Sequence, residues 1–147
     1  MSRKVVTAVV WLAFAGPVVA RLVWETLPHH HHHGPVGPHG GPLADWGGGA
    51  YHLELVAQPG EGRVTVYVLD RTARTPRAID AAAVTLSAKA DPATVARLAP
   101  DPEPGDPAGR STRYSARSGL FKAGAAAGVT VTGTVGGVEY AGEFAPE

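Results

Sequence analysis

The sequence YHLELVAQPGEGRVTVYVLD, residues 51–70, alternates between apolar and polar residues on both sides of a turn. Alternation with a period of two places every second side chain on the same face of an extended strand. The two alternating halves are residues 51–56 and 63–70, and residues 58–62, QPGEG, are typical of a reverse turn. This segment therefore predicts a β-hairpin.

The same alternation recurs along the chain and predicts five further short strands. They cover residues 82–90, 94–99, 113–118, 129–135 and 138–144. Gly136-Gly137 joins the last two as a hairpin turn, because both central positions of a type I′ turn need positive φ. About seven short strands at this spacing predict an all-β fold, an immunoglobulin-like antiparallel β-sandwich. A small barrel is the alternative architecture.

The first twenty residues have the order of a secretory signal peptide. Arg3 and Lys4 form a positive start, residues 5–20 are uncharged, and small residues precede Arg21. We expect cleavage after Ala20 and a periplasmic location in a bacterium. The alternative is an inner-membrane anchor through residues 5–20, although this segment is shorter than the roughly 20 residues that span a bilayer.

Residues 21–50 predict a flexible tether that is rich in histidine, glycine and proline. Four prolines exclude a regular helix or a central strand, and seven glycines keep the backbone loose. Leu43 and Trp46, near its end, are candidates for docking the tether on the domain. The predicted organisation is a signal peptide at 1–20, this tether and a β-sandwich domain at 51–147.

Composition excludes several classes of function. Thirteen basic residues balance thirteen acidic ones, so no basic field favours nucleic acid, and we expect membrane contact only through the signal or anchor segment. The chain has no cysteine, which removes disulfides, thiolate metal sites, iron–sulfur clusters and cysteine nucleophiles. Gly47-Gly48-Gly49 lacks the lysine and helix of a phosphate loop. We therefore predict no catalytic residues and no enzymatic activity.

All seven histidines lie between His29 and His52, and five of them are consecutive. Imidazole is the commonest protein ligand for borderline metal ions, and without cysteine the chemistry favours divalent copper, nickel, zinc or cobalt. The histidine run, residues 29–33, offers many ligands without a fixed geometry. A purification tag or compositional drift is the alternative explanation for this run, although a tag usually stands at a chain end.

A second group of candidate ligands includes a histidine that a predicted strand holds in place. His52 and Glu54 share one strand face, about 7 Å apart, and His39 can fold back through Gly40-Gly41. Asp45 is a candidate fourth ligand. The plain alternative is a histidine beside a glutamate on a solvated strand face. The predicted metal ligands of the chain are His29, His30, His31, His32, His33, His39, His52 and Glu54.

Residues 38–70, PHGGPLADWGGGAYHLELVAQPGEGRVTVYVLD, resemble a family of small exported bacterial domains with an HGG segment, a YHLELV-like strand and a VYVLD-like strand. These domains occur alone or beside the periplasmic adaptor subunits of heavy-metal RND efflux systems. The closing VTVTGTVGGVEYAGEF is also similar to the family, so the resemblance covers residues 38–145. It departs after Asp70, where RTARTPRA replaces a Gly-Lys-Pro turn. The resemblance implies metal handling in the periplasm and an RND efflux adaptor as a partner.

Together these features predict a periplasmic metal-binding accessory protein that captures a divalent transition metal for homeostasis or efflux. Metal binding through imidazole should weaken below a pH of about 6.5, where histidines ordinarily protonate. The alternative is a structural or protein-interaction module of the cell envelope, whose sheet edge pairs with a partner and whose histidines are incidental.

Overall fold

The structure is a computed structural model that describes residues 36–93, 95–119 and 128–144. The strands are β1 (Leu43–Trp46), β2 (Tyr51–Gln58), β3 (Arg63–Leu69), β4 (Val84–Ala88), β5 (Val95–Pro100), β6 (Arg113–Arg117), β7 (Val129–Val135) and β8 (Val138–Phe144). All neighbouring strands pair antiparallel, and the described residues contain no α-helix. The predicted all-β, antiparallel class is therefore confirmed. In this part of the chain no helix is long and apolar enough to cross a membrane.

The strands join in the order β1-β2-β3-β6-β5-β4-β7-β8, which brings distant parts of the sequence together. One Greek key comprises β3 to β6, because β4, β5 and β6 follow one another and β3 lies beside β6. A second comprises β4 to β7, because β7 returns to lie beside β4. The predicted hairpin of residues 51–70 thus becomes β2 and β3, of which β3 belongs to the first Greek key and β2 lies beside it.

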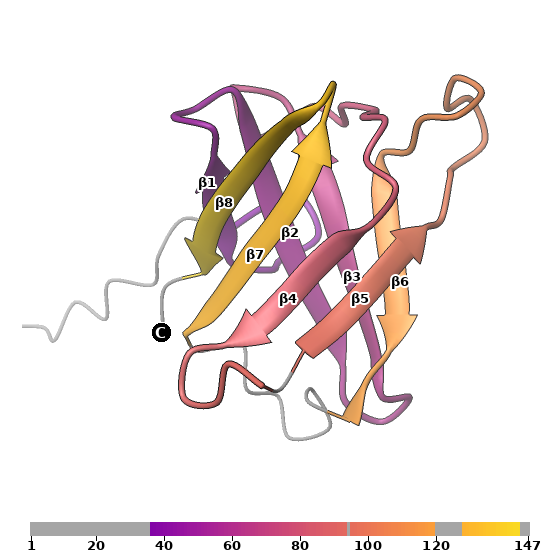
Figure 1. The fold of residues 1–147 in the computed structure, drawn as a ribbon. Helices are drawn as coiled ribbons and strands as arrows, with labels where there is room; N and C mark the ends of the chain where they lie inside the picture. Colours follow the sequence, from indigo (N-terminus) through magenta and orange to yellow (C-terminus); the bar gives the residue numbers. More distant parts are fainter. Residues whose placement is uncertain (1–35, 94, 120–127, 145–147) are drawn as a thin grey trace, which may run out of the picture. The chain divides into compact units, whose positions relative to one another are not determined.

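The strands lie in two layers that almost close on each other. Figure 1 shows β8, β7, β4 and β5 in front of β1, β2, β3 and β6. On one side β5 joins the layers, because Leu98 pairs with β4 whereas Ala99 and Pro100 pair with β6. On the other side β1 and β8 come close without forming a hydrogen-bonded ladder. The sheet is therefore nearly closed into a barrel.

Glycines close the seam between β1 and β8. A Cβ atom on Gly142 would collide with the carbonyl oxygen of Asp45, and one on Gly47 would collide with the ring of Tyr140. The two segments run antiparallel here. Tyr140 lies beside Gly47, whereas Gly142, further along β8, lies beside Asp45, which precedes Gly47. Each strand thus shields part of the other's edge, which would otherwise expose unpaired backbone groups.

Trp46 fills the space between the layers. Its side chain is fully buried, and a Cβ atom on Gly133 of β7 would lie 2.9 Å from its ring. Tyr51 and Tyr140 pack around the indole, with ring centroids 6.3 Å and 5.5 Å from it. The surrounding core is mostly aliphatic and includes Leu53, Leu55, Val64, Val66, Val68, Ile79, Val84, Leu86, Leu98, Val131 and Phe144. All of these residues except Ile79 lie in predicted strands, where every second side chain faces the core, whereas Ile79 lies in the connection after β3.

The structure confirms all seven strands that the alternation predicts and adds β1. Gly136 and Gly137 have φ angles of 57° and 81°, which confirms the predicted conformation of the last turn. The predicted tether boundary at residue 50 lies too late, because the fold already includes residues 36–50. The sequence does not predict β1, because this strand has only four residues and is flanked by glycine and proline, which are typical of loops. The predicted signal peptide and residues 21–35 lie outside the described residues.

Candidate functional site

The predicted metal ligands fall into two parts of the chain. The histidine run, residues 29–33, lies outside the described residues, so it stays a sequence-based prediction. His39, His52 and Glu54 all lie in the described part. His39 belongs to a short loop before β1, residues 37–42, which we call the His39 loop, and the other two belong to β2.

Glu54 lies at the centre of this site, and its side chain is 0% exposed. Its Oε1 accepts hydrogen bonds from the backbone N–H groups of His39, at 2.7 Å, and of Gly41, at 3.0 Å. Its Oε2 lies 2.8 Å from Nδ1 of the His39 ring. A carboxylate is tolerated in the interior only where such donors replace the water that it loses. Glu54 therefore does not lie on a solvated strand face, because the His39 loop covers it.

Two glycines bring the His39 loop close enough to β2 for these bonds. A Cβ atom on Gly37 would collide with the carboxyl carbon of Glu54, and one on Gly41 would collide with the carbonyl oxygen of Leu55. The N–H of Gly37 donates to the carbonyl of Gly41 at 2.8 Å and closes the loop on itself. Glycine at both positions thus lets the loop backbone reach the carboxylate.

The His39 ring is held from two sides and is oriented by Glu54. It stacks on Tyr67 of β3, with ring centroids 3.7 Å apart and an interplanar angle of 10°. Its Nδ1 faces a carboxylate, which can only accept, so in the neutral imidazole the proton lies on Nδ1. Nε2 then carries the free lone pair and bonds no residue in the described part of the chain. The side chain is 41% exposed, so part of the ring is accessible to solvent.

His52 has the same tautomer for a different reason. Its Nδ1 lies 3.1 Å from the carbonyl oxygen of Asp70, which is also an acceptor only, so Nδ1 carries the proton and Nε2 the lone pair. Asp45 lies opposite His52 in the register of β1 and β2. However, the Oδ1 atom of Asp45 accepts the N–H of Gly49 at 2.7 Å and so stabilises the turn between these strands. Asp45 is therefore occupied as a turn residue.

The described residues contain no group of three or more His, Asp or Glu side chains placed to hold a metal ion. The structure brings His39 and Glu54 into contact, whereas His52 bonds elsewhere. His52 and Glu54 nevertheless share one sheet face, because they lie two residues apart on β2. The site thus offers two imidazole nitrogens of fixed tautomer. In protein metal sites such imidazoles usually donate the other N–H to a carboxylate or carbonyl, as both do here.

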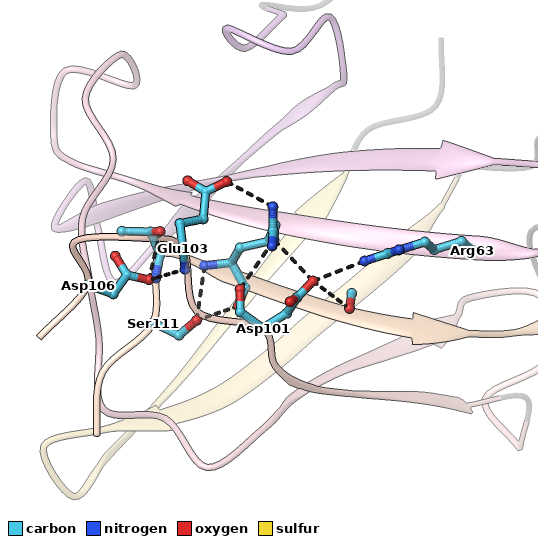
Figure 2. A network of polar contacts seen from close by, with 8 residues as sticks. Arg63, Asp101, Glu103, Asp106 and Ser111 are labelled. Atoms are coloured by element: carbon cyan, nitrogen blue, oxygen red, sulfur yellow. Dashed lines mark hydrogen bonds and ion pairs between the residues drawn. The ribbon is translucent and has the colours of Figure 1, made fainter. Parts of the chain in front are cut away.

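A second polar cluster, which was not predicted from the sequence, ties the connection between β5 and β6 to the sheet (Figure 2). We call it the Arg113 network. The Arg113 guanidinium bonds Asp101 at 3.1 Å and Glu103 at 2.9 Å, and Arg63 of β3 bonds the same Asp101 carboxylate at 3.0 Å. Ser115 donates its hydroxyl to Asp101 at 3.0 Å. The signal in the sequence is weak, because these residues come from three separate segments.

The charges of the Arg113 network stabilise one another. Burial alone would raise the pKa of Asp101, but hydrogen bonds from Arg113 and Ser115 and the positive charges of Arg113 and Arg63 outweigh it and lower that pKa. Burial likewise opposes the charge of Arg113, but its acidic partners raise the pKa of the guanidinium. The two arginines and the carboxylates of Asp101 and Glu103 are paired with one another. We assign it a structural role.

Comparisons of the chain with protein-family models, with curated proteins and with solved structures found no match. The resemblance to exported domains of heavy-metal efflux systems therefore stays a prediction. What the chain can bind has to be inferred from its own residues.

Proposed function

We propose that this protein is a periplasmic metal-binding accessory protein, which captures divalent copper, nickel, zinc or cobalt for homeostasis or efflux. The observation that carries the proposal is His39, whose partly exposed ring is fixed by Glu54 with Nε2 bonded to no described residue. A borderline metal ion prefers this neutral imidazole nitrogen. The proposal includes export by the signal peptide at 1–20, or anchoring through residues 5–20, and an RND efflux adaptor as the receiving partner.

The two groups of histidines have different roles in metal binding. The histidine run supplies up to five imidazoles and thus capacity, whereas His39 and His52 supply nitrogens whose direction is fixed by a hydrogen bond at the other ring nitrogen. Glu54, which the sequence predicts as a metal ligand, has a different role in this proposal. Both of its oxygens already accept hydrogen bonds in the interior, so it orients His39 as a carboxylate behind the ligand and does not bind the metal itself.

The finer fold prediction, an immunoglobulin-like sandwich, is likewise a proposal. The two layers, the antiparallel pairing and the two Greek keys support it. The alternative function, an envelope module that pairs through its sheet edge, receives less support. Its two edge strands β1 and β8 shield each other where Asp45 meets Gly142.

Calorimetric titration with Cu(II), Ni(II) and Zn(II) tests the metal-binding proposal. The purified protein is compared with two variants, one with all five histidines of the run changed to alanine and one with His39→Ala and His52→Ala. The first variant should bind fewer ions. The second should keep that capacity but lose about tenfold or more in the affinity of the tightest site. Weak and equal binding by all three proteins at neutral pH would refute the proposal, and a partner captured in excess chelator would favour the envelope module.

A further inference from the structure

A cleft of about 430 Å³ lies beside the seam between β1 and β8 and is separate from the His39 loop. Its walls come from the start of β2, from the connection after β3 and from β8. The lining residues are Ala50, Tyr51, Asp70, Arg71, Arg77 and Tyr140. A volume of this size falls in the range of small-molecule sites. The two arginines belong to RTARTPRA, the segment in which the chain departs from the resemblance noted above.

Arg71 and Arg77 bring two positive charges to this cleft. Arg63 and Arg113 engage carboxylates, whereas neither cleft arginine has an ion pair or a side-chain hydrogen bond with a described residue. Asp70 is the acidic residue of the lining. Its Oδ1 accepts hydrogen bonds from the backbone and hydroxyl of Thr72, so its charge is engaged within its own turn.

The backbone around these arginines is held firmly. The N–H of Arg77 donates to the carbonyl of Val68 at 2.9 Å, and the N–H of Asp70 donates to the carbonyl of Thr75 at 2.8 Å. The hydrogen bonds of this turn, that of the Thr72 hydroxyl foremost, also lower the pKa of Asp70. The backbone that carries the two exposed arginine side chains is thus held in place, which reduces the backbone entropy lost when they bind a ligand.

Two tyrosine rings also line the cleft. Tyr51 and Tyr140 meet edge to face, with centroids 5.8 Å apart and an interplanar angle of 85°. Both rest on the buried Trp46, and the Tyr140 ring lies directly against Gly47. Neither phenol hydroxyl bonds a residue in the described ranges. The two tyrosines therefore give the cleft both aromatic surface and hydrogen-bond donors.

We infer that this cleft binds a small oxyanion, a carboxylate or phosphate group carried on a flat apolar body. Guanidinium groups recognise both anions through paired charged hydrogen bonds, and the tyrosine rings would cover the body of the ligand. The chemistry at the arginines is shared by the two anions, so the experiment distinguishes them. The site does not depend on the metal-binding proposal.

Nuclear magnetic resonance titrations at constant ionic strength test this inference with three probes: benzoate, phenyl phosphate and inorganic phosphate. We expect saturable amide shifts at residues 50–51, 71–77 and 140 with at least one aromatic probe, and weaker binding of inorganic phosphate. Benzoate alone would assign the site to carboxylates, and phenyl phosphate alone to phosphates. The double variant Arg71→Ala/Arg77→Ala should lose tenfold or more in affinity.

Arg110→Ala is the matched control, because Arg110 is exposed, lies in a loop and does not line the cleft. It should bind like the wild type. The inference is overturned if no probe gives saturable shifts at the cleft, or if Arg110→Ala weakens binding as much as the double variant. His39→Ala should leave anion binding unchanged, which separates this result from the metal titration.

Discussion

The domain holds two carboxylate clusters that are built in opposite ways. Glu54 is fully buried and is satisfied by two backbone N–H groups and one imidazole. Asp101 is 29% exposed and is satisfied by two guanidinium groups and a hydroxyl. The first cluster depends on hydrogen bonds in the interior, and the second depends on matched charge near solvent.

This difference shows which of the two clusters has a group that remains free to bind a ligand. In the Arg113 network the two arginines are paired with the carboxylates of Asp101 and Glu103, so neither guanidinium is left for a ligand. The Glu54 cluster uses one nitrogen of His39 and leaves the other one open. A buried acid that is bonded by an imidazole thus creates a directed metal ligand, whereas a balanced ion network only stabilises the loop that carries it.

The largest expected effect is that of Glu54→Ala. The change leaves three donors without their acceptor beneath the His39 loop, and bonds to a charged acceptor contribute about 1.5–3 kcal/mol each. We therefore expect a loss of roughly 3 kcal/mol or more in the free energy of unfolding, measured by urea denaturation. Glu139→Ala, an exposed position on β8, should change it by less than about 0.5 kcal/mol. Similar losses of unfolding free energy in the two variants would contradict the claim that the buried Glu54 cluster depends on its hydrogen bonds.

Gly37→Ala should have the next largest effect, because the added Cβ atom would push the loop away from Glu54. Overpacking of this kind costs about 1–3 kcal/mol. Gly60→Ala is the matched control, since a Cβ atom there has open space and its φ is not in the left-handed region. Thermal unfolding of both variants measures the difference. An unchanged melting temperature for Gly37→Ala would mean that the loop does not need this close approach.

Asp101→Asn should have the smallest effect, a loss of about 1 kcal/mol at neutral pH, because partly exposed ion pairs contribute little. The folded protein holds the pKa of Asp101 below its ordinary value of 3.8. Its stabilisation is therefore present above that value and is lost as the pH falls through the lowered pKa. Urea denaturation at a series of pH values should show the two proteins converging in acid. Glu61→Gln, an exposed control, should change the free energy of unfolding at neutral pH by less than about 0.5 kcal/mol.

The strands could be predicted from the sequence because the alternation marks the face that packs into the core, as Val64, Val66 and Val68 show. It does not report the burial of Thr65 and Leu69 on the other face of the same strand. Strand β1 could not, since glycine and proline around residues 43–46 are typical of a loop. Glu54 also has the spacing of an outward residue, and its burial depends on a loop fifteen residues away. The Arg113 network joins β3 to β6 and to the connection before it, and single-sequence patterns do not report such long-range partners.

The tautomer of His39 tests the central claim most directly. Long-range proton–nitrogen spectra at mildly alkaline pH distinguish a protonated Nδ1 from a protonated Nε2. We predict the proton on Nδ1, with Nε2 unprotonated and selectively shifted when Zn(II) is added, and we predict that Glu54→Gln removes this preference in a folded protein. A proton on Nε2 in the wild type, or a His39 ring that does not respond to zinc, would contradict the account.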